Sequence, residues 1–500
     1  MTRRLVRLAN HLHSLSATLA LAAIGGAPAS AQVIPLRTVP VASGDQFLML
    51  PSATMGMGGV RLAVDDTLAD AWSNPAKGSL VSETAFLGSP TYYGISNNGG
   101  GGRTFPIAAL VTGSTLFGGG ALALQQIEDG GPEDFFCCDP WWGWSQPRRI
   151  SDSFSRNLYA SGFVGVRLGS AWAVGIGGSA ASLDAMDGVD LLYAGSDRIE
   201  QSGSTQDIRV GVYHAAERDR LELTLLHSRV SMEHDVTWTD WVVDPITMSV
   251  TPQQRIERNE DRGRTWGAHL AWDRDLSAPG WRVGASGTVN RKSHPKIPNY
   301  QIQNIPRDPG LTWAYEAAVG FARSTGATTF GLDVALQPIW SETWQEADTA
   351  DVNASGGDLQ VGDRSIENDF FFTNVMLRSG LAHDVGRATL QAGLEVRSYA
   401  YTLEQVDHVQ ESNREQDETW MEWTPTFGVA LRFSELQVRY AGRVTSGTGR
   451  PGTELPWGVG FAEALNQSAS PDFIIAPSGP LTLQSVSVVT HQISVRVAVR

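Results

Sequence analysis

The side chains with the most evident chemical potential lie in residues 128–152, where two cysteines are adjacent. Cys137 and Cys138 are the only cysteines of the chain. They either form a strained vicinal disulfide or stay reduced, and one such pair cannot organise a chain of 500 residues. Because no histidine or further cysteine lies nearby, we expect no metal at this place.

The same loop is rich in large aromatic side chains, which are costly to expose to water. They are Phe135, Phe136, Trp141, Trp142 and Trp144. Two interpretations stay open. The residues form a candidate capture loop for a hydrophobic ligand near an outer lipid leaflet, or they pack on a rim of the protein or dip into lipid.

Motifs of enzyme chemistry are absent from the sequence. No Gly-x-Ser-x-Gly, His-Glu-x-x-His or P-loop string occurs. His227, His269 and His491 have no serine or cysteine partner in a recognisable motif. The acidic residues of segment 347–366 do not have the spacing of an EF-hand, so that we expect a solvated loop. The sequence therefore predicts no enzyme, no cofactor and no metal site.

The first 31 residues have the pattern of a secretory signal peptide. Arg3, Arg4 and Arg7 form a basic start, and a short apolar run covers residues 15–24. The small residues of 29–31 then give a typical cleavage site. The apolar run is too short to span a bilayer, which needs about 20 residues. We expect residues 1–31 to be a cleaved signal peptide, so that the mature protein is exported.

The charge balance excludes several classes of partner. The chain has 38 basic and 53 acidic residues, for a formal net charge of −15. This balance argues against binding to nucleic acid and against a basic membrane-surface anchor. After residue 31 no apolar run reaches the length of a transmembrane helix. A membrane protein of this composition would have to be a barrel, whose strands are only half apolar because one face points into the lumen.

From residue 84 to the C-terminus, apolar and polar side chains alternate in successive segments. In 390–397, for example, Leu390, Ala392, Leu394 and Val396 share one face, and Gln391, Gly393, Glu395 and Arg397 share the other. A period of two is the signature of a strand, because successive side chains point to opposite faces. The charged face also carries glycine and alanine, which suits a lumen of limited room. We count 16 such segments, and 14 remains open.

The connections between these segments alternate between short and long. Tight turns fall at 113–114, 169–170 and 384–386, whereas long polar loops fall at 237–262, 408–417 and 448–482. Outer-membrane barrels have short turns on the periplasmic rim and long loops on the extracellular rim. The sequence therefore predicts an all-β fold, a transmembrane antiparallel up-and-down barrel of 14–16 strands over residues 84–500 with both termini in the periplasm.

Residues 52–80 contain a Met-Gly-Gly-like run, then Asp-Asp, then Asn-Pro-Ala before the first strand. This string resembles the N-terminal signature of the FadL-type outer-membrane transporters and the related PorV-like barrels. The matching residues are Gly56, Gly59, Ala63, Asp65, Asp66, Asn74, Pro75 and Ala76. Lys77 departs from the pattern, since a glycine often follows Asn-Pro-Ala. The chain also ends in Val499 and Arg500 rather than on an aromatic residue, and the resemblance implies 14 strands rather than 16.

The resemblance implies that residues 32–83 form a hatch folded inside the barrel. Its residues would be Gly56, Gly59, Asp65, Asp66, Asn74, Pro75 and Ala76. Glu395, Arg397 and Arg432 would be lumen charges, and we expect Asp65 and Asp66 to pair with an arginine such as Arg397 or Arg432. The segment either gates passage or only seals the barrel, and both interpretations stay open.

The function that the resemblance implies is passive uptake of small hydrophobic molecules, such as long-chain fatty acids or hydrocarbons, across the bacterial outer membrane. The expected partners are outer-membrane lipid and the hydrophobic substrate, with no nucleic acid. Two other functions stay open. One is a PorV-like scaffold that holds a protein partner for secretion or surface attachment, and the other is a general diffusion porin.

Overall fold

The computed structural model describes residues 42–128, 155–189, 196–294, 310–451 and 483–499, apart from residues 43, 98, 188, 244, 245, 247, 248, 348 and 349. The expected signal peptide lies outside the described residues, and so do the first residues of the expected hatch. The candidate capture loop with Phe135, Phe136, Trp141, Trp142 and Trp144, together with Cys137 and Cys138, also lies outside them.

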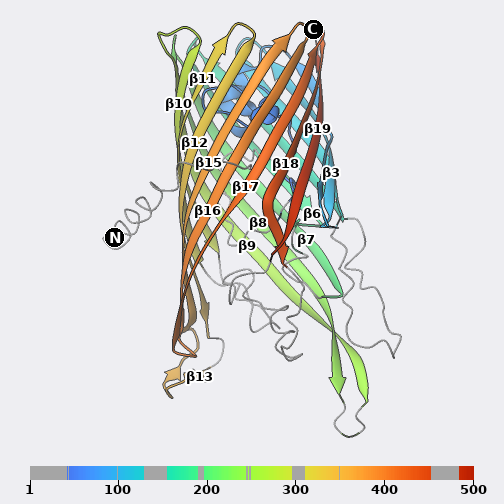
Figure 1. Ribbon diagram of the computed structural model, residues 1–500, viewed down its shortest axis with the longest axis vertical. Coiled ribbons are helices and arrows are strands. Elements are labelled where there is room, and N and C mark those ends of the chain that lie inside the picture. The colour runs from blue at the N-terminus through green and yellow to red at the C-terminus, as the bar shows by residue number, and fades with distance from the viewer. Residues whose placement is uncertain are drawn as a thin grey trace.

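Nearly all of the described chain is β-strand (Figure 1). The strands are β1 (Ala85–Gly88), β2 (Thr91–Ile95), β3 (Gly101–Thr112), β4 (Leu116–Glu128), β5 (Ser155–Leu168), β6 (Trp172–Leu183), β7 (Arg198–Ala215), β8 (Asp219–Val243), β9 (Val250–Asp275), β10 (Trp281–His294), β11 (Gly310–Thr325), β12 (Thr328–Glu346), β13 (Asp351–Val352), β14 (Asp358–Leu359), β15 (Arg364–Val385), β16 (Ala388–Asp407), β17 (Ser412–Arg432), β18 (Leu436–Pro451) and β19 (Leu483–Ala498). The short helices are η1 (Met55–Met57), α2 (Asp70–Ser73) and η2 (Pro75–Leu80). Within the described residues, no helix is long and apolar enough to cross a membrane.

The strands close into a single antiparallel barrel. Each wall strand pairs with its neighbours in the sequence, and β1 and β2 pair with β3 on one side and with β19 on the other. Because β1 and β2 are one wall strand interrupted at Ser89 and Pro90, the wall has 16 strands. The alternation of side chains therefore predicted the right number, and the count of 14 that the resemblance implied is wrong.

Two segments that the sequence predicted as loops are strands. Residues 237–262 form the far ends of β8 and β9, which pair with each other almost to the tip and project beyond the rest of the wall (Figure 1). β17 begins at Ser412, so that the predicted loop 408–417 is shorter than expected. Alternation fails to reveal such projecting strands, because their outward face is polar, as the ion pair between Arg258 and Asp235 shows, and their inward face mixes apolar and charged residues, such as the buried Val236 and Glu257.

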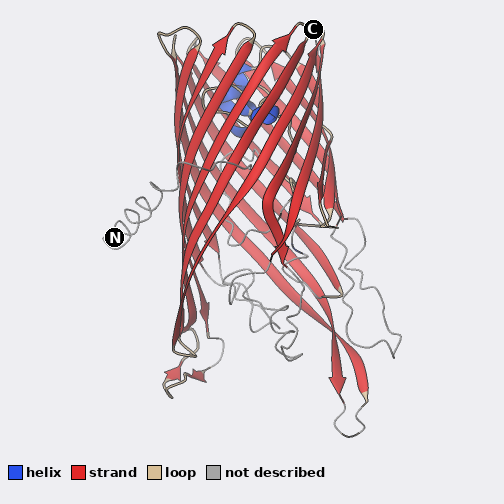
Figure 2. Ribbon diagram, viewed as in Figure 1, coloured by secondary structure: helices blue, strands red, loops and turns tan. Residues whose placement is uncertain are grey.

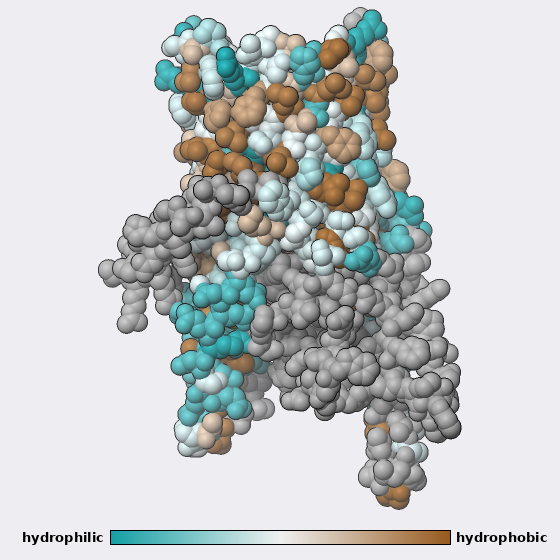
Figure 3. Space-filling view, in the orientation of Figure 1, coloured by the Kyte–Doolittle hydropathy of each residue, from teal (hydrophilic) through white to brown (hydrophobic). Residues whose placement is uncertain are grey.

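The outer face of the wall carries an apolar belt. Along β9 the outward side chains are Arg274, Trp272, Leu270, Ala268, Trp266 and Arg264. Positions 264 and 274 are roughly 23 Å apart along the barrel axis, at a rise of about 3.3 Å per residue and a tilt of about 45°. This is close to the height of about 25 Å expected for a lipid-facing band. Figure 3 shows hydrophobic side chains gathered over the wall and hydrophilic ones over a projecting part.

The two ends of the barrel differ as the sequence predicted. One end has short turns, such as 113–115 and 386–387, and the C-terminus lies there (Figure 1). We call it the short-turn end and the other the long-loop end. The three short helices lie inside the barrel toward the short-turn end (Figure 2). They belong to residues 44–83, which we call the N-terminal segment.

The apolar belt predicts that the cost of a charge depends on its depth. Leu225 and Leu221 both face outward on β8, and they are 50% and 39% exposed. Leu225→Arg places a charge near the middle of the belt and should lower the free energy of unfolding by about 2–4 kcal/mol, whereas Leu221→Arg near the short-turn end should cost about 0–1 kcal/mol. Denaturant unfolding in lipid vesicles measures both. Equal costs would show that the belt is not in lipid.

Candidate functional site

The backbone of the N-terminal segment packs against glycines on the inner face of the wall. Under η1 these are Gly380 on β15, Gly393 on β16 and Gly428 on β17. A Cβ atom added at Gly393 would collide with the backbone nitrogen of Gly58, and one added at Gly380 would collide with the carbonyl of Met57. No other residue leaves room for so close an approach of two backbones. These three glycines form what we call the glycine seat of η1.

The rest of the segment meets the opposite side of the wall in the same way. A Cβ atom at Gly175 on β6 would lie 2.7 Å from the carbonyl carbon of Pro75, and one at Gly211 on β7 would collide with the Asn74 side chain. Between the two sides, Gly284 on β10 lies against Leu62. The segment therefore contacts the wall on several sides of the lumen.

The glycines predicted from the sequence lie where the segment needs them. Gly56 is buried against Gly428, and a Cβ atom added at Gly56 would lie 2.8 Å from the Cα atom of Gly428. Gly58 and Gly59 both have a φ of 70°, the left-handed conformation that other residues rarely adopt. Gly59 also lies beside Glu395, which is one of the two lumen charges predicted on β16. Glu395 is buried and pairs with Arg378 at 3.5 Å.

Asp65 and Asp66 have different partners. Asp65 pairs with the wall through Arg282 on β10, at 2.9 Å. Asp66 is buried and holds the segment together, because its carboxylate accepts hydrogen bonds from the backbone nitrogens of Ala53 at 2.8 Å and Leu68 at 3.2 Å. Asp65 thus fixes the segment to the barrel, and Asp66 joins two parts of the segment to each other.

The predicted pairing of these aspartates with Arg397 or Arg432 is wrong. Arg397 is buried in the lumen, where it donates to the Tyr399 hydroxyl at 3.0 Å. Arg432 lies at the short-turn end of β17 and pairs with Asp384 at 3.0 Å. Both arginines lie in other parts of the wall than Arg282. The prediction failed because the register between the segment and the wall cannot be read from the sequence.

Asn74 begins η2 and also anchors it. Its side-chain oxygen accepts from the backbone nitrogen of Ala76 at 3.1 Å, so that it caps the helix with Pro75 in the first turn. Its side-chain nitrogen donates to Glu222 on β8 at 3.3 Å. Lys77, which departs from the family pattern, pairs with Asp70 at 2.8 Å and with Glu222 at 3.5 Å.

This cluster of Asp70, Lys77 and Glu222 is charged and largely buried. Burial raises the pKa of Asp70 to about 7, although the charge of Lys77 opposes the shift. Burial alone lowers the pKa of Lys77, but the carboxylates of Glu222 and Asp70 outweigh it and raise that pKa. His269 on β9 lies 3.9 Å from Glu222. The lysine is therefore firmly charged, whereas Asp70 titrates near neutral pH.

A second anchor, at the start of the segment, was not predicted from the sequence. Asp45 forms a buried ion pair with Arg443 on β18, with 2.9 Å between Oδ2 and Nε, and also accepts from Thr490 on β19. The next residue, Gln46, donates to the Tyr159 hydroxyl at 3.1 Å. Neither residue belongs to the matched motif, and their partners are far away in the sequence, so that no local pattern marks them.

A lumenal aromatic cluster lies farther toward the long-loop end. On β15 the inner face that starts at Gly380 continues, two residues at a time, through Arg378, Met376, Asn374, Phe372 and Phe370. The cluster consists of Ala314, Ile339, Phe370, Phe372, Tyr401 and Leu403, each at most 4% exposed, with Trp420 packed against it. The rings of Phe372 and Tyr401 are 5.4 Å apart.

The lumen wall is layered between the aromatic cluster and the N-terminal segment. Next to the cluster come Gln337 and Asn374, which are polar and buried. Next to the segment come charges, where Asp333 on β12 accepts from the backbone nitrogen of Arg61 at 2.7 Å and Arg61 pairs with Glu316 at 3.5 Å. On β15 the inner face thus changes from the apolar Phe372 through the polar Asn374 and the buried Met376 to the charged Arg378 nearest the segment.

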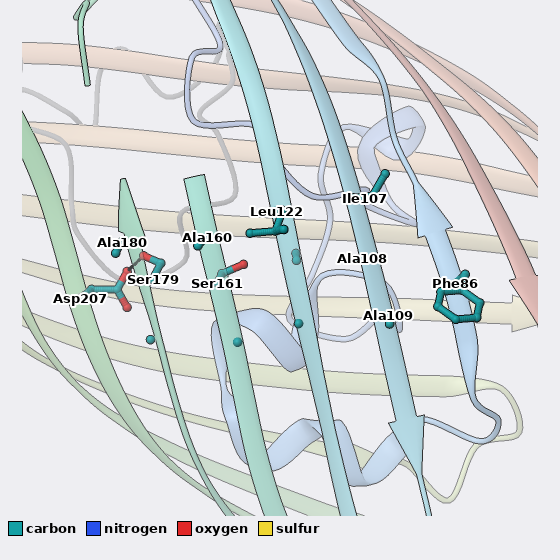
Figure 4. Close-up of a pocket in the computed structure, with 14 residues that line it drawn as sticks. Phe86, Ile107, Ala108, Ala109, Leu122, Ala160, Ser161, Ser179, Ala180 and Asp207 are labelled. Carbon is teal, nitrogen blue, oxygen red and sulfur yellow. Dashed lines mark hydrogen bonds between the residues drawn. The ribbon is translucent and has the colours of Figure 1, made fainter. Parts of the chain in front are cut away.

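Two cavities accompany this arrangement. A small one of about 140 Å³ lies between the N-terminal segment and the wall, and charged side chains such as Asp70, Lys77 and Glu222 line it. A larger concavity of about 710 Å³ lies at β1 and β3 to β7 (Figure 4). Outward residues such as Phe86 and Leu122, which are 60% and 55% exposed, border it, and many of its other residues are glycines and alanines. It is an apolar hollow in a thin part of the wall.

Comparison with known proteins adds little to these observations. No family model matches the chain, and no curated protein matches it. A FadL homologue of Pseudomonas aeruginosa is similar in structure, with a TM-score of 0.44, 12% identity and coverage of 91% of this chain and 100% of the other. The toluene transporter TbuX of Ralstonia pickettii has a TM-score of 0.39 and 10% identity, and covers 89% of this chain and 97% of its own.

Barrels with other cargo are similar to about the same degree. The ferric-catecholate import receptor Fiu of E. coli K12 has a TM-score of 0.36 and 9% identity, with coverage of 83% of this chain and 82% of its own. Similarities this low distinguish neither a family nor a cargo. The barrel fold of this chain is established by its own strand pairing.

Proposed function

We propose that this protein is an exported outer-membrane channel for passive uptake of small hydrophobic molecules, such as long-chain fatty acids or hydrocarbons. In this proposal residues 32–83 form a hatch that closes the lumen. The observation that carries it is the lumenal aromatic cluster, in which Phe370, Phe372 and Tyr401 lie on the inner face of the wall. A channel for hydrophilic solutes has a lumen lined by polar groups rather than by an apolar surface of this kind.

The layered lumen supports a route from the long-loop end inward. A hydrophobic molecule that enters from outside meets the aromatic cluster before it meets the N-terminal segment. The side chains of the cluster are buried against one another, so that a ligand binds there only when they move apart, and the apolar area that it then buries contributes about 25 cal/mol per Å². The space beside the segment is small and lined by ionised groups, so that an apolar molecule gains nothing by passing through it. Onward passage therefore requires the segment to move.

The contacts of the segment are suited to reversible movement. Its attachments to the wall include ion pairs, such as those of Asp65, Arg61 and Lys77, and each can exchange for water. The part of the segment around α2 and η2 also packs in a hydrophobic core against wall residues such as Phe117 and Phe163. No energy source is needed, because a hydrophobic solute moves down its own gradient. The same segment argues against a general diffusion porin, since it lies inside the barrel and contacts the wall on several sides.

The aromatic cluster should determine the uptake rate. Phe370→Ala combined with Phe372→Ala removes apolar contacts worth about 1.5–3 kcal/mol for each side chain, so that oleate uptake by proteoliposomes should fall at least about tenfold. Phe371→Ala is the matched control. Phe371 lies on the same strand but faces outward, 5.2 Å from the ring of Trp340, and its loss should leave uptake nearly unchanged. Wild-type uptake no faster than that of protein-free liposomes would contradict the proposed function.

The glycine seat should keep the channel closed. Gly393→Val puts a branched side chain where the backbone of Met57 and Gly58 lies, so that η1 must leave its place. We expect wild-type protein in planar bilayers to show almost no conductance and Gly393→Val to show stable open-channel steps. Gly287→Val is the control, because an added Cβ there meets nothing within 4 Å. Large steps in the wild type would show that the segment does not seal the lumen.

Closure should also depend on pH through Asp70. Its pKa of about 7 in the docked segment lies above the usual 3.8, so that the docked state binds the proton more tightly than the free state does. Protonation of Asp70 therefore stabilises the docked state most below about pH 4, and this stabilisation is lost as the pH rises through about 7. The open fraction should rise between pH 5 and pH 9 in single-channel records, and Asp70→Asn should abolish the rise. A wild-type open fraction that falls with pH would contradict this assignment.

A further inference from the structure

Three arginines lie side by side on the outer face of the wall, at the long-loop border of the apolar belt. They are Arg229 on β8, Arg264 on β9 and Arg291 on β10, and all three are exposed. Arg229 is directly opposite Arg264 in the strand register. Arg291 is diagonal to Arg264, because Arg264 pairs with Ser293. Direct and diagonal neighbours on one face lie about 5 Å and about 7–8 Å apart, so that three long side chains can reach one point. We call this group the arginine patch.

The arginine patch is not balanced by acidic neighbours. Within the described part of the chain, no ion pair of these three arginines with a carboxylate occurs. The acidic side chains just beyond them on the projecting hairpin have other partners, since Asp235 pairs with Arg258 and Glu260 pairs with Arg262. Like charges placed directly opposite each other destabilise a sheet. Uncompensated positive charge at this place, on a chain of net charge −15, points to an anion that comes from outside the chain.

The surroundings of the arginine patch are those of a boundary between hydrocarbon and headgroups. Toward the belt, Trp266 is 60% exposed, and its ring stacks on His227 at 4.1 Å. The guanidinium of Arg291 lies 5.9 Å from the centre of the Trp313 ring. Indole rings are typical of this depth in a membrane. The next outward side chain along β9 is Ala268 and then comes the exposed Leu270, so that acyl chains have an apolar surface to lie on.

We propose that the arginine patch binds the phosphate group of a phosphorylated lipid in the outer leaflet. Guanidinium groups present paired donors that match phosphate oxygens, and a phosphate offers enough acceptors for several arginines. The anion relieves the repulsion between Arg229 and Arg264, while the acyl chains cover Trp266 and Leu270. This inference rests on the proposed outer-membrane location but not on the uptake of hydrophobic molecules or on the hatch.

Native mass spectrometry of the delipidated protein in dodecyl maltoside tests the inference, with bisphosphorylated lipid A as the probe. We expect one lipid to bind, and the combined variant Arg229→Gln, Arg264→Gln and Arg291→Gln should bind it at least about tenfold more weakly. The matched control changes Arg218, Arg274 and Arg323 to glutamine. These three arginines lie near the short-turn end, so that the control loses the same charge and should bind lipid A like the wild type.

Three further comparisons decide the result. Lipid A without its phosphate groups should bind poorly, and a thousandfold excess of inorganic phosphate should displace little lipid. The triple lysine variant keeps the charge and should retain most of the binding, while the electrophoretic shift of the folded barrel on heating shows that each variant folds. Equal binding by the glutamine variant and the wild type overturns the inference, and so does full displacement by inorganic phosphate. Neither outcome affects uptake of oleate, so that the two proposals fail separately.

Discussion

In the proposed outer-membrane location, the wall of this protein depends on one constraint. A backbone N–H or C=O group in hydrocarbon has no water to bind and must be paired within the wall. Closure meets this constraint, and its weakest place is the first wall strand, which is interrupted at Ser89 and Pro90. The N-terminal segment lies directly behind the interruption. The Ser89 hydroxyl donates to the carbonyl of Met49 at 3.4 Å, and Gln492 of the last strand donates to the carbonyl of Leu50 at 3.5 Å. The segment therefore supports the closure of the wall as well as occupying the lumen.

The same constraint explains how an irregular segment is tolerated inside the barrel. Its helices are too short to pair most of their own backbone groups, and the polar inner face of the wall supplies the missing partners. Gly58 donates its N–H to Thr426 at 2.8 Å, and the carbonyl of Ser79 accepts from Arg167 at 2.8 Å. Inward glycines such as Gly393 bring the two backbones close enough for these bonds. The mixture of glycine, polar and charged residues on one face of the strands is thus the surface on which the segment folds.

The sequence predicted the wall well, because a period of two is a local property of each strand. It did not predict contacts that depend on register between distant segments, and for this reason Arg282 was missed as the partner of Asp65. Residues 370–372 are three consecutive phenylalanines. Only the strand pairing shows that Phe370 and Phe372, the first and the last of them, face the lumen. The Asn74 turn was foreseen from its motif, whereas the role of Lys77 was not, because its partner Glu222 lies on β8.

The arrangement of the lumen also bears on how the proposed channel opens. A hydrophobic molecule that fills the aromatic cluster excludes water from the layer beneath it, and ion pairs become stronger as water leaves. The pairs of Arg61 with Glu316 and of Asp65 with Arg282 are then held more firmly, so that the arrival of the ligand does not loosen them. The contact between η1 and the glycine seat differs, because it depends on the close packing of glycines against backbone. A small displacement of η1 is enough to break this contact. On the proposed function, steric displacement of η1 is therefore the first step of opening, and the ion pairs exchange for water only after it.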